Sequence, residues 1–233
     1  MFYLFPKKIQ LQASQAKWSL QSAKAVLLIV GLAHLKSQTD FTDSVLAQHL
    51  LQLIKKAKAL DIPIVDLDMH QPQHGMLHLG QKLGRDSQLV VAGMVDSQFK
   101  QIMKYMSSVT QNICVINDAI LLQNLDQHIQ WINTIAAQNI QHSNTQNVTR
   151  LWALSAPSEL ILSSKGILLA IAEQLDMDAL EIDPEVDLRE YGLDSVAMVS
   201  LIGLWRANGA DITYENFWEN NSLVKLFHFL KIS

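Results

Sequence analysis

The sequence is poor in cysteine, proline and glycine, and it has no long apolar run. Among 233 residues there are one cysteine, five prolines and nine glycines. A single cysteine excludes an internal disulfide framework, and no apolar stretch approaches the roughly 18 residues that a membrane-spanning helix requires. At the N-terminus apolar residues precede the basic ones, which is the reverse of a signal peptide. We therefore expect a soluble, cytoplasmic protein with no membrane association.

Glutamate is missing from the first two-thirds of the chain. All seven glutamates lie in residues 157–233, whereas 20 glutamines lie in residues 1–156. The first part holds 13 basic and 9 acidic residues, a net charge of +4, and the second holds 5 basic and 13 acidic residues, a net charge of −8. This break predicts two folding units with different partners, although simple drift in composition is an alternative. The acidic second part argues against binding to nucleic acid.

The first part alternates between strand-like and helix-like patterns. Residues 25–33 form an unbroken apolar run, which is typical of a strand buried on both faces. Alternation of strands and helices predicts an α/β domain with a parallel sheet covered by helices on both sides. Cys114 lies within a predicted strand and is expected to be a small core residue. The other predicted strands are residues 61–67, 88–93, 112–119 and a short last one at 150–152, and the predicted helices are 42–60, 97–108 and 125–138.

The second part reads as helical throughout. Small residues and a proline at 153–157 coincide with the change in charge, so we expect a linker there between a domain at 1–152 and a domain at 158–233. An acidic loop is expected at residues 176–191. Four helices in this length predict a small four-helix bundle. The predicted helices are residues 158–175, 195–207, 214–219 and 222–230.

The string Tyr-Gly-Leu-Asp-Ser-Val at residues 191–196 stands between the acidic loop and an apolar helix. It places Ser195 at a helix start, where free backbone N–H groups and a partial positive charge stabilise a phosphate. Gly192 allows a sharp turn, Leu193 can anchor that turn in the core, and Asp194 can stabilise the helix start or meet a metal ion. In the alternative interpretation, Asp194 and Ser195 are only a helix-capping pair and the chain is an interaction protein.

This string resembles the signature of carrier-protein domains, whose serine bears 4′-phosphopantetheine. The resemblance implies that Ser195 is a tether, with Gly192, Leu193 and Asp194 forming the turn that presents it. Residues 157–233 further resemble the aryl carrier domains of catechol-siderophore synthesis, through Leu-Trp-Arg at 204–206, Asp-Ile at 211–212 and the asparagines at 220 and 221.

The aryl carrier resemblance implies a set of partners. A phosphopantetheinyl transferase would load the carrier, an adenylating ligase would supply an aryl acid, with 2,3-dihydroxybenzoate favoured over salicylate, and a condensation or cyclisation domain of a non-ribosomal peptide synthetase would receive it. The implied partner-binding surface consists of Met198, Val199, Tyr214 and Trp218, for each of which core packing is the alternative.

Residues 1–152 resemble an isochorismatase domain, through segments 25–29, 61–65, 79–93 and 114–119. The family places a catalytic aspartate after its first strand, where this chain has Gly31, and glycine has no proton to exchange. The family's loop lysine is also missing from residues 66–76, and Lys82 and Lys100 are the nearest substitutes. The resemblance therefore implies a degenerate, catalytically inactive domain that serves as a scaffold and forms a homodimer. No catalytic residue is expected.

An active isochorismatase with a rearranged site is the alternative for this domain. Its possible parts are His34, Asp40, Asp66, Asp68 and His70, which do not assemble into a mechanism from the sequence. A repeat of histidines in the same region invites a metal site, but intervening proline and glycine oppose one continuous helix. A surface loop without a metal is the better interpretation of these histidines, His70, His74 and His78.

Overall fold

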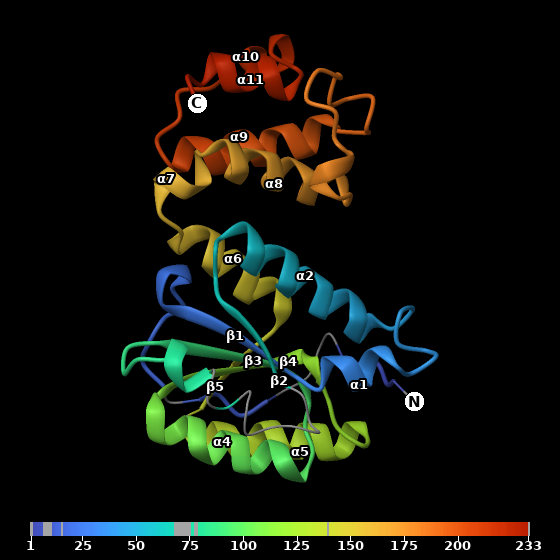
Figure 1. The fold of residues 1–233 in the computed structure, drawn as a ribbon, viewed down its shortest axis with the longest axis vertical. Coiled ribbons are helices and arrows are strands. Elements are labelled where there is room, and N and C mark those ends of the chain that lie inside the picture. Colours follow the sequence, from blue (N-terminus) through green and yellow to red (C-terminus); the bar gives the residue numbers. More distant parts are fainter. Residues whose placement is uncertain are drawn as a thin grey trace. The chain divides into compact units, whose positions relative to one another are not determined.

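The computed structural model describes residues 2–6, 11–14, 16–67, 76, 79–138 and 140–232. The chain divides into two compact units, residues 1–155 and residues 156–233 (Figure 1). Within the described residues, no helix is long and apolar enough to cross a membrane.

The first unit is built on a five-stranded sheet in the order β2-β1-β3-β4-β5, in which all neighbouring strands are parallel. Every residue of β1 is buried, as an apolar run covered on both faces requires. The prediction of a parallel α/β sheet is confirmed. The strands are β1 (Ala25–Val30), β2 (Ile64–Leu67), β3 (Gln88–Met94), β4 (Asn112–Leu121) and β5 (Gln141–Ser143).

Helices cover both faces of this sheet (Figure 1). On one face α1 (Leu32–Lys36), α2 (Val45–Ala59) and α6 (Thr145–Ser155) pack against Leu27 and Ile29 of β1. On the other face α4 (Ser97–Val109) and α5 (Leu125–Ala137) pack against Val26 and Leu28. Successive β1 residues thus enter opposite cores, because side chains alternate along a strand.

The ends of this unit differ from the sequence prediction. The strand predicted at 150–152 is wrong, because these residues belong to α6, where Val148 and Trp152 are spaced by one helical turn and both are fully buried. The last strand is instead β5, which the sequence analysis missed. Its three residues, Gln-His-Ser, carry no apolar alternation from which a strand could be recognised.

The second unit is helical. The helix predicted at 158–175 is interrupted, because Ser163 caps a new helix by accepting a hydrogen bond from the Gly166 N–H at 3.0 Å. Of the linker predicted at 153–157, only Ala156 and Pro157 lie between helices, since α6 continues through Ser155. The elements are α7 (Ser158–Ile161), α8 (Ser164–Leu175), η2 (Ala179–Glu181), α9 (Ser195–Ala207), α10 (Tyr214–Glu219) and α11 (Leu223–Phe229), joined by a core that includes Ile167, Ile171, Leu201, Trp205, Phe217 and Leu226.

The N-terminal residues are held against α5 by a buried histidine. His128 is fully buried, and its Nδ1 lies 3.0 Å from the Tyr3 hydroxyl, which accepts a hydrogen bond from the Leu122 N–H at 2.9 Å. The Phe5 ring lies 4.5 Å from the imidazole, centroid to centroid. Further along, the Gln12 N–H donates to Asn133 Oδ1 at 2.8 Å. Burial disfavours the charged imidazolium and lowers the pKa of His128 to about 4.

We expect the first unit to lose stability as the pH falls from neutrality to 5. Between its ordinary pKa of about 6.5 and the folded value of about 4, His128 binds a proton in the unfolded chain only. Linkage then predicts that the free energy of unfolding is about 2 kcal/mol lower at pH 5 than at pH 7 because of this residue. Urea unfolding at the two pH values measures the difference, and the difference should shrink by that amount in His128→Gln. The control His34→Gln removes an exposed histidine from the same unit and should leave the difference between the two pH values unchanged. If the difference is also unchanged in His128→Gln, His128 is not the residue that causes the loss of stability.

Candidate functional site

Ser195 is the first residue of α9 and is exposed. The residue before it, Asp194, is the N-cap, with φ −88° and ψ 174°, and its Oδ1 accepts a hydrogen bond from the Ala197 N–H at 2.8 Å. Because the aspartate supplies the capping oxygen, the hydroxyl of Ser195 is not needed as a cap. The interpretation of this pair as a cap is therefore correct for Asp194 and leaves Ser195 available for another role.

The first turn of α9 is suited to an anion. The first N–H groups of a helix have no partner within the helix and carry a partial positive charge. This turn contains no acidic residue beyond the N-cap. A phosphate attached to the Ser195 hydroxyl would lie at this helix end, where such groups are stabilised.

The turn before Ser195 is fixed by Gly192 and Leu193. Gly192 has φ +97°, and its N–H donates to the Arg189 carbonyl at 3.0 Å. Apart from the neighbouring residues in the chain, no atom lies within 4 Å of the place where a Cβ would stand. A side chain would therefore fit in the available space, and it is the positive φ that favours glycine here. Leu193 is 4% exposed, and its N–H donates to the Leu188 carbonyl at 3.2 Å. The leucine thus anchors in the core the turn that leaves the serine outside.

A polar cluster ties the acidic loop to the last helices. Asp187 accepts two hydrogen bonds from the Arg189 Nε, at 2.9 and 3.0 Å, and forms an ion pair with the same guanidinium. It also accepts from Asn221 Nδ2 at 2.7 Å, while the Leu188 N–H donates to the Asn221 carbonyl at 2.8 Å. Hydrogen bonding to Arg189 lowers the pKa of Asp187, and the same bond raises the pKa of Arg189. The loop before the serine is therefore an ordered part of the unit.

The same arginine supports an aromatic pair on α10. The guanidinium carbon of Arg189 lies 4.3 Å from the centroid of the Trp218 ring, a favourable cation–π distance. Trp218 in turn stacks on Tyr214, with centroids 6.0 Å apart and an angle of 25° between the rings. The sequence analysis missed Asp187, Arg189 and Asn221. The contacts of Asp187 with Asn221 and of Arg189 with Trp218 join positions more than 25 residues apart, and no local sequence pattern indicates such contacts.

Three of the four residues predicted to meet partners are accessible. Val199 is 59% exposed, Trp218 is 46% exposed and Tyr214 is half-buried. The prediction that Met198 lies on this surface is wrong, because Met198 is 1% exposed and shares the inward face of α9 with Leu201 and Trp205. Val196, which the sequence alone did not single out, is 72% exposed in the first turn of α9.

At the end of β1, where the resemblance to the isochorismatase family would place an aspartate, this chain has Gly31. Gly31 follows β1 with φ 70°, caps α1, and donates its N–H to the Leu67 carbonyl at 2.9 Å. On the other side Gly93 of β3 has φ +104°, and a Cβ there would lie 2.2 Å from the Val30 carbonyl oxygen. Doubly wound sheets bind ligands where the strand order reverses, which here is between β1 and β3. At that place a side chain on Gly93 would clash with the backbone of Val30.

The other candidate residues of the first unit are only partly described. His34, Asp40 and Asp66 are exposed, and Asp68, His70, His74 and His78 lie outside the described residues. Among the described residues, no group of three potential ligands could hold a metal ion. Cys114 is fully buried, as predicted, and burial raises the pKa of its thiol to about 12.

Comparison with known proteins identifies the second unit. Residues 165–230 match the family described as phosphopantetheine attachment site. A stretch of 55 residues is 38% identical to the phenyloxazoline synthase MbtB of Mycobacterium sp. (strain MCS). This stretch covers 24% of this chain and 5% of that protein. The second unit is thus a carrier domain whose cofactor is covalently attached 4′-phosphopantetheine, and a phosphopantetheinyl transferase is its partner.

Two glycines of the second unit are expected to respond oppositely to alanine. Gly192→Ala places a side chain at positive φ and should lower the local free energy of unfolding by roughly 1 to 2 kcal/mol through strain. Gly203, inside α9, also has no atom within 4 Å of a Cβ, so Gly203→Ala should stabilise the helix by about 0.5–1 kcal/mol. Hydrogen exchange of α9 in the full chain measures both changes. A Gly192→Ala protein with unchanged protection would show that the turn does not depend on this conformation.

Proposed function

We propose that Ser195 is the attachment point of 4′-phosphopantetheine and that the chain is an aryl carrier protein of non-ribosomal siderophore synthesis. The observation that carries this proposal is the exposed serine at the capped start of α9, inside the matched segment 165–230. The aryl acid proposed is 2,3-dihydroxybenzoate. An aryl group is supported by the relative's name, since a phenyloxazoline contains a phenyl ring.

Each residue of the turn would have its own role in presenting the 4′-phosphopantetheine group. When bound, the group supplies a thiol on a flexible arm, to which the aryl acid is joined as a thioester. Ser195 Oγ would bond to the phosphorus, and the first N–H groups of α9 would face the phosphate oxygens. Asp194 uses Oδ1 as the helix cap, which leaves Oδ2 to approach the metal ion of the transferase. Gly192 and Leu193 keep the serine on the outside of the unit.

We infer an apolar partner-binding surface formed by Val199, Tyr214 and Trp218, to which we add Val196. The rings of Trp205 and Phe217 lie 5.3 Å apart in the core and join α9 to α10, so the outward residues of these helices belong to one packed pair. Helix α9 carries no acidic residue, and therefore apolar contact, together with Arg189 beneath Trp218, would determine recognition. The expected partners are an adenylating ligase and a condensation or cyclisation domain.

We propose that the first unit is a degenerate isochorismatase-like domain without hydrolase activity. This is supported by Gly31 at the place of the family's aspartate and by the close packing of Gly93 on Val30. Its role would be that of a scaffold that forms a homodimer. Its net charge of +4 would attract acidic partners over a distance of about one Debye length, roughly 8 Å at physiological salt.

Incubation with coenzyme A and a broad-specificity phosphopantetheinyl transferase tests the attachment point. Intact-protein mass spectrometry should show a gain of one phosphopantetheine in the full chain and none in Ser195→Ala. Ser200→Ala is the matched control, since Ser200 is exposed on the same helix, and it should be modified normally. A thiol reagent at neutral pH should then label only the modified protein, because the chain's single cysteine is buried. A folded protein that gains no mass would refute the proposal.

A single charge on the proposed surface should impair loading by the ligase. In Val199→Asp the new carboxylate would be desolvated in the complex at a cost of about 1–3 kcal/mol, so kcat/KM of a 2,3-dihydroxybenzoate-adenylating ligase for the modified protein should fall about tenfold or more. Val224→Asp, a 42% exposed valine on α11, is the control and should behave as the unchanged protein. Equal effects of the two substitutions would place the partner elsewhere.

A further inference from the structure

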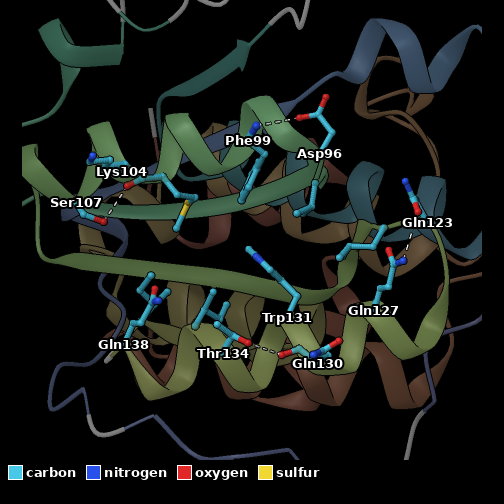
Figure 2. Close-up of a pocket in the computed structure, with 15 residues that line it drawn as sticks. Asp96, Phe99, Lys104, Ser107, Gln123, Gln127, Gln130, Trp131, Thr134 and Gln138 are labelled. Atoms are coloured by element: carbon cyan, nitrogen blue, oxygen red, sulfur yellow. Dashed lines mark hydrogen bonds between the residues drawn. The ribbon is translucent and has the colours of Figure 1, made fainter.

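The first unit has a groove between α4 and α5 with a volume of about 1000 Å³ (Figure 2). Phe99, which lines it, is fully buried, and Asp96 caps α4 by accepting a hydrogen bond from the Phe99 N–H at 2.9 Å. Within the described residues, none of the buried polar atoms that lack a hydrogen bond belongs to the lining. The groove therefore does not indicate a ligand, whereas a cation of the second unit does.

Among the described residues, the guanidinium of Arg189 is hydrogen-bonded along one edge and free along the other. Its Nε and Nη2 atoms both donate to the carboxylate of Asp187. Nη1 has no hydrogen-bond partner in the described part of the chain and is not one of its enclosed polar atoms, so solvent reaches it. A planar guanidinium has more N–H donors than the two that Asp187 occupies. The end that carries Nη1 is the free edge of Arg189.

The free edge is accessible beside the proposed partner-binding surface. The Arg189 side chain is 35% exposed, and its guanidinium carbon lies 4.3 Å from the centroid of the Trp218 ring. Trp218 is itself 46% exposed. A partner that covers the indole ring would therefore also meet the free edge of the arginine.

Asp187 compensates the charge of Arg189 only in part, because Lys225 acts on the same carboxylate. Hydrogen bonding with Arg189 and, with a smaller effect, the charge of Lys225 lower the pKa of Asp187. Lys225 Nζ also lies 3.4 Å from Asn221 Oδ1, and Asn221 Nδ2 donates to Asp187 at 2.7 Å. Two cations thus share one anion, which leaves the cluster with an excess of positive charge.

This positive cluster is an exception in its unit. Residues 157–233 hold 13 acidic and 5 basic residues, and α10 carries the exposed Glu215 and Glu219 beside its aromatic pair. A partner that complements such a surface is basic over most of its contact area and needs an anion only where the surface is positive. An anion placed elsewhere would meet like charges, so Arg189 would fix the register of the complex.

We propose that the free edge of Arg189 binds a carboxylate of the partner protein, an aspartate or glutamate at the rim of the apolar patch that covers Trp218. This inference rests on the partner-binding surface proposed above and adds the group that the partner must supply. Arginine suits this role because its planar fork donates to a carboxylate in a bidentate manner. The contact with Asp187 holds the guanidinium in place beforehand, so less side-chain entropy is lost on binding.

Two other roles of Arg189 lead to different expectations. If Arg189 only supports Trp218, then Asp187, which holds the arginine, is needed for partner binding as much as Arg189 is. If the arginine instead binds the phosphate of the arm on Ser195, it acts without a partner. A direct ion pair with the partner requires the charge and the fork of Arg189, and Asp187 competes for both.

Loading kinetics of the phosphopantetheine-bearing full chain with a 2,3-dihydroxybenzoate-adenylating ligase test the proposal. Arg189→Gln should raise the KM for the carrier about tenfold with kcat unchanged, because the lost contact contributes to docking and not to the reaction. Arg189→Lys keeps the charge without the fork and should give an intermediate KM. The matched control Arg206→Gln removes the same charge from an exposed arginine in the last turn of α9 and should change KM by less than about twofold.

Asp187→Asn separates the proposed ion pair from mere support of Trp218. Asparagine keeps an oxygen for Arg189 Nε and removes the competing negative charge, so KM should stay unchanged or fall. A rise of KM like that in Arg189→Gln would overturn the proposal and leave Arg189 with a supporting role only. Equal KM values in Arg189→Gln and Arg206→Gln would overturn it as well.

Phosphorus NMR of the modified protein without ligase tests the contact with the arm. The signal of the attached group should be the same in Arg189→Gln and Arg206→Gln. A shift confined to Arg189→Gln would assign the guanidinium to the phosphate and overturn the proposal.

Loading of the unchanged protein, measured in the same assay, separates this inference from the proposed function. No loading at all would refute the proposed function and this inference with it. Normal loading of the unchanged protein together with equal loading of the two arginine-to-glutamine variants would refute this inference alone.

Discussion

The capping hydrogen bond that the Ala197 N–H donates to Asp194 Oδ1 is the interaction on which the carrier unit depends. Serine and aspartate are both good N-caps, and at this helix start only one of them serves. Asp194 takes the cap, Gly192 supplies the positive φ of the turn, and Leu193 is buried. The hydroxyl of Ser195 therefore lies outside the core and is not needed to cap the helix. A residue that carries a tethered cofactor must be accessible in this way.

The cluster around Asp187 connects the loop before Ser195 to the aromatic residues of the proposed partner-binding surface. Asp187 joins Arg189 to Asn221, and Arg189 continues onto Trp218 and Tyr214. A large aromatic side chain that is 46% exposed would ordinarily be free to change rotamer. Contacts with Arg189 and Tyr214 restrict the Trp218 side chain, so less conformational entropy remains to be lost when a partner binds.

The sequence predicted the elements whose signals are local. The capped start of α9 and the buried run of β1 follow from residues adjacent in the chain. Met198 was wrongly placed on the surface because helix α9 is apolar on most of its positions, so the sequence does not distinguish its inward face from its outward face. Only the burial of Leu201 and Trp205 shows which face is inward. Strand β5 was missed because a polar strand of three residues is defined by its partner β4 alone. The pair Arg189 and Trp218 depends likewise on tertiary contact.

In parallel sheets, ligands bind at the carboxyl ends of the strands. In the first unit Gly31 follows β1 at that edge with φ 70°, and a Cβ on Gly93 of β3 would lie 2.2 Å from the Val30 carbonyl oxygen. Neither position can supply a side chain to a site there, because glycine has none. The proposed absence of hydrolase activity therefore depends on single positions at the strand ends. The sheet itself keeps five parallel strands, so the fold does not require catalytic side chains at this edge.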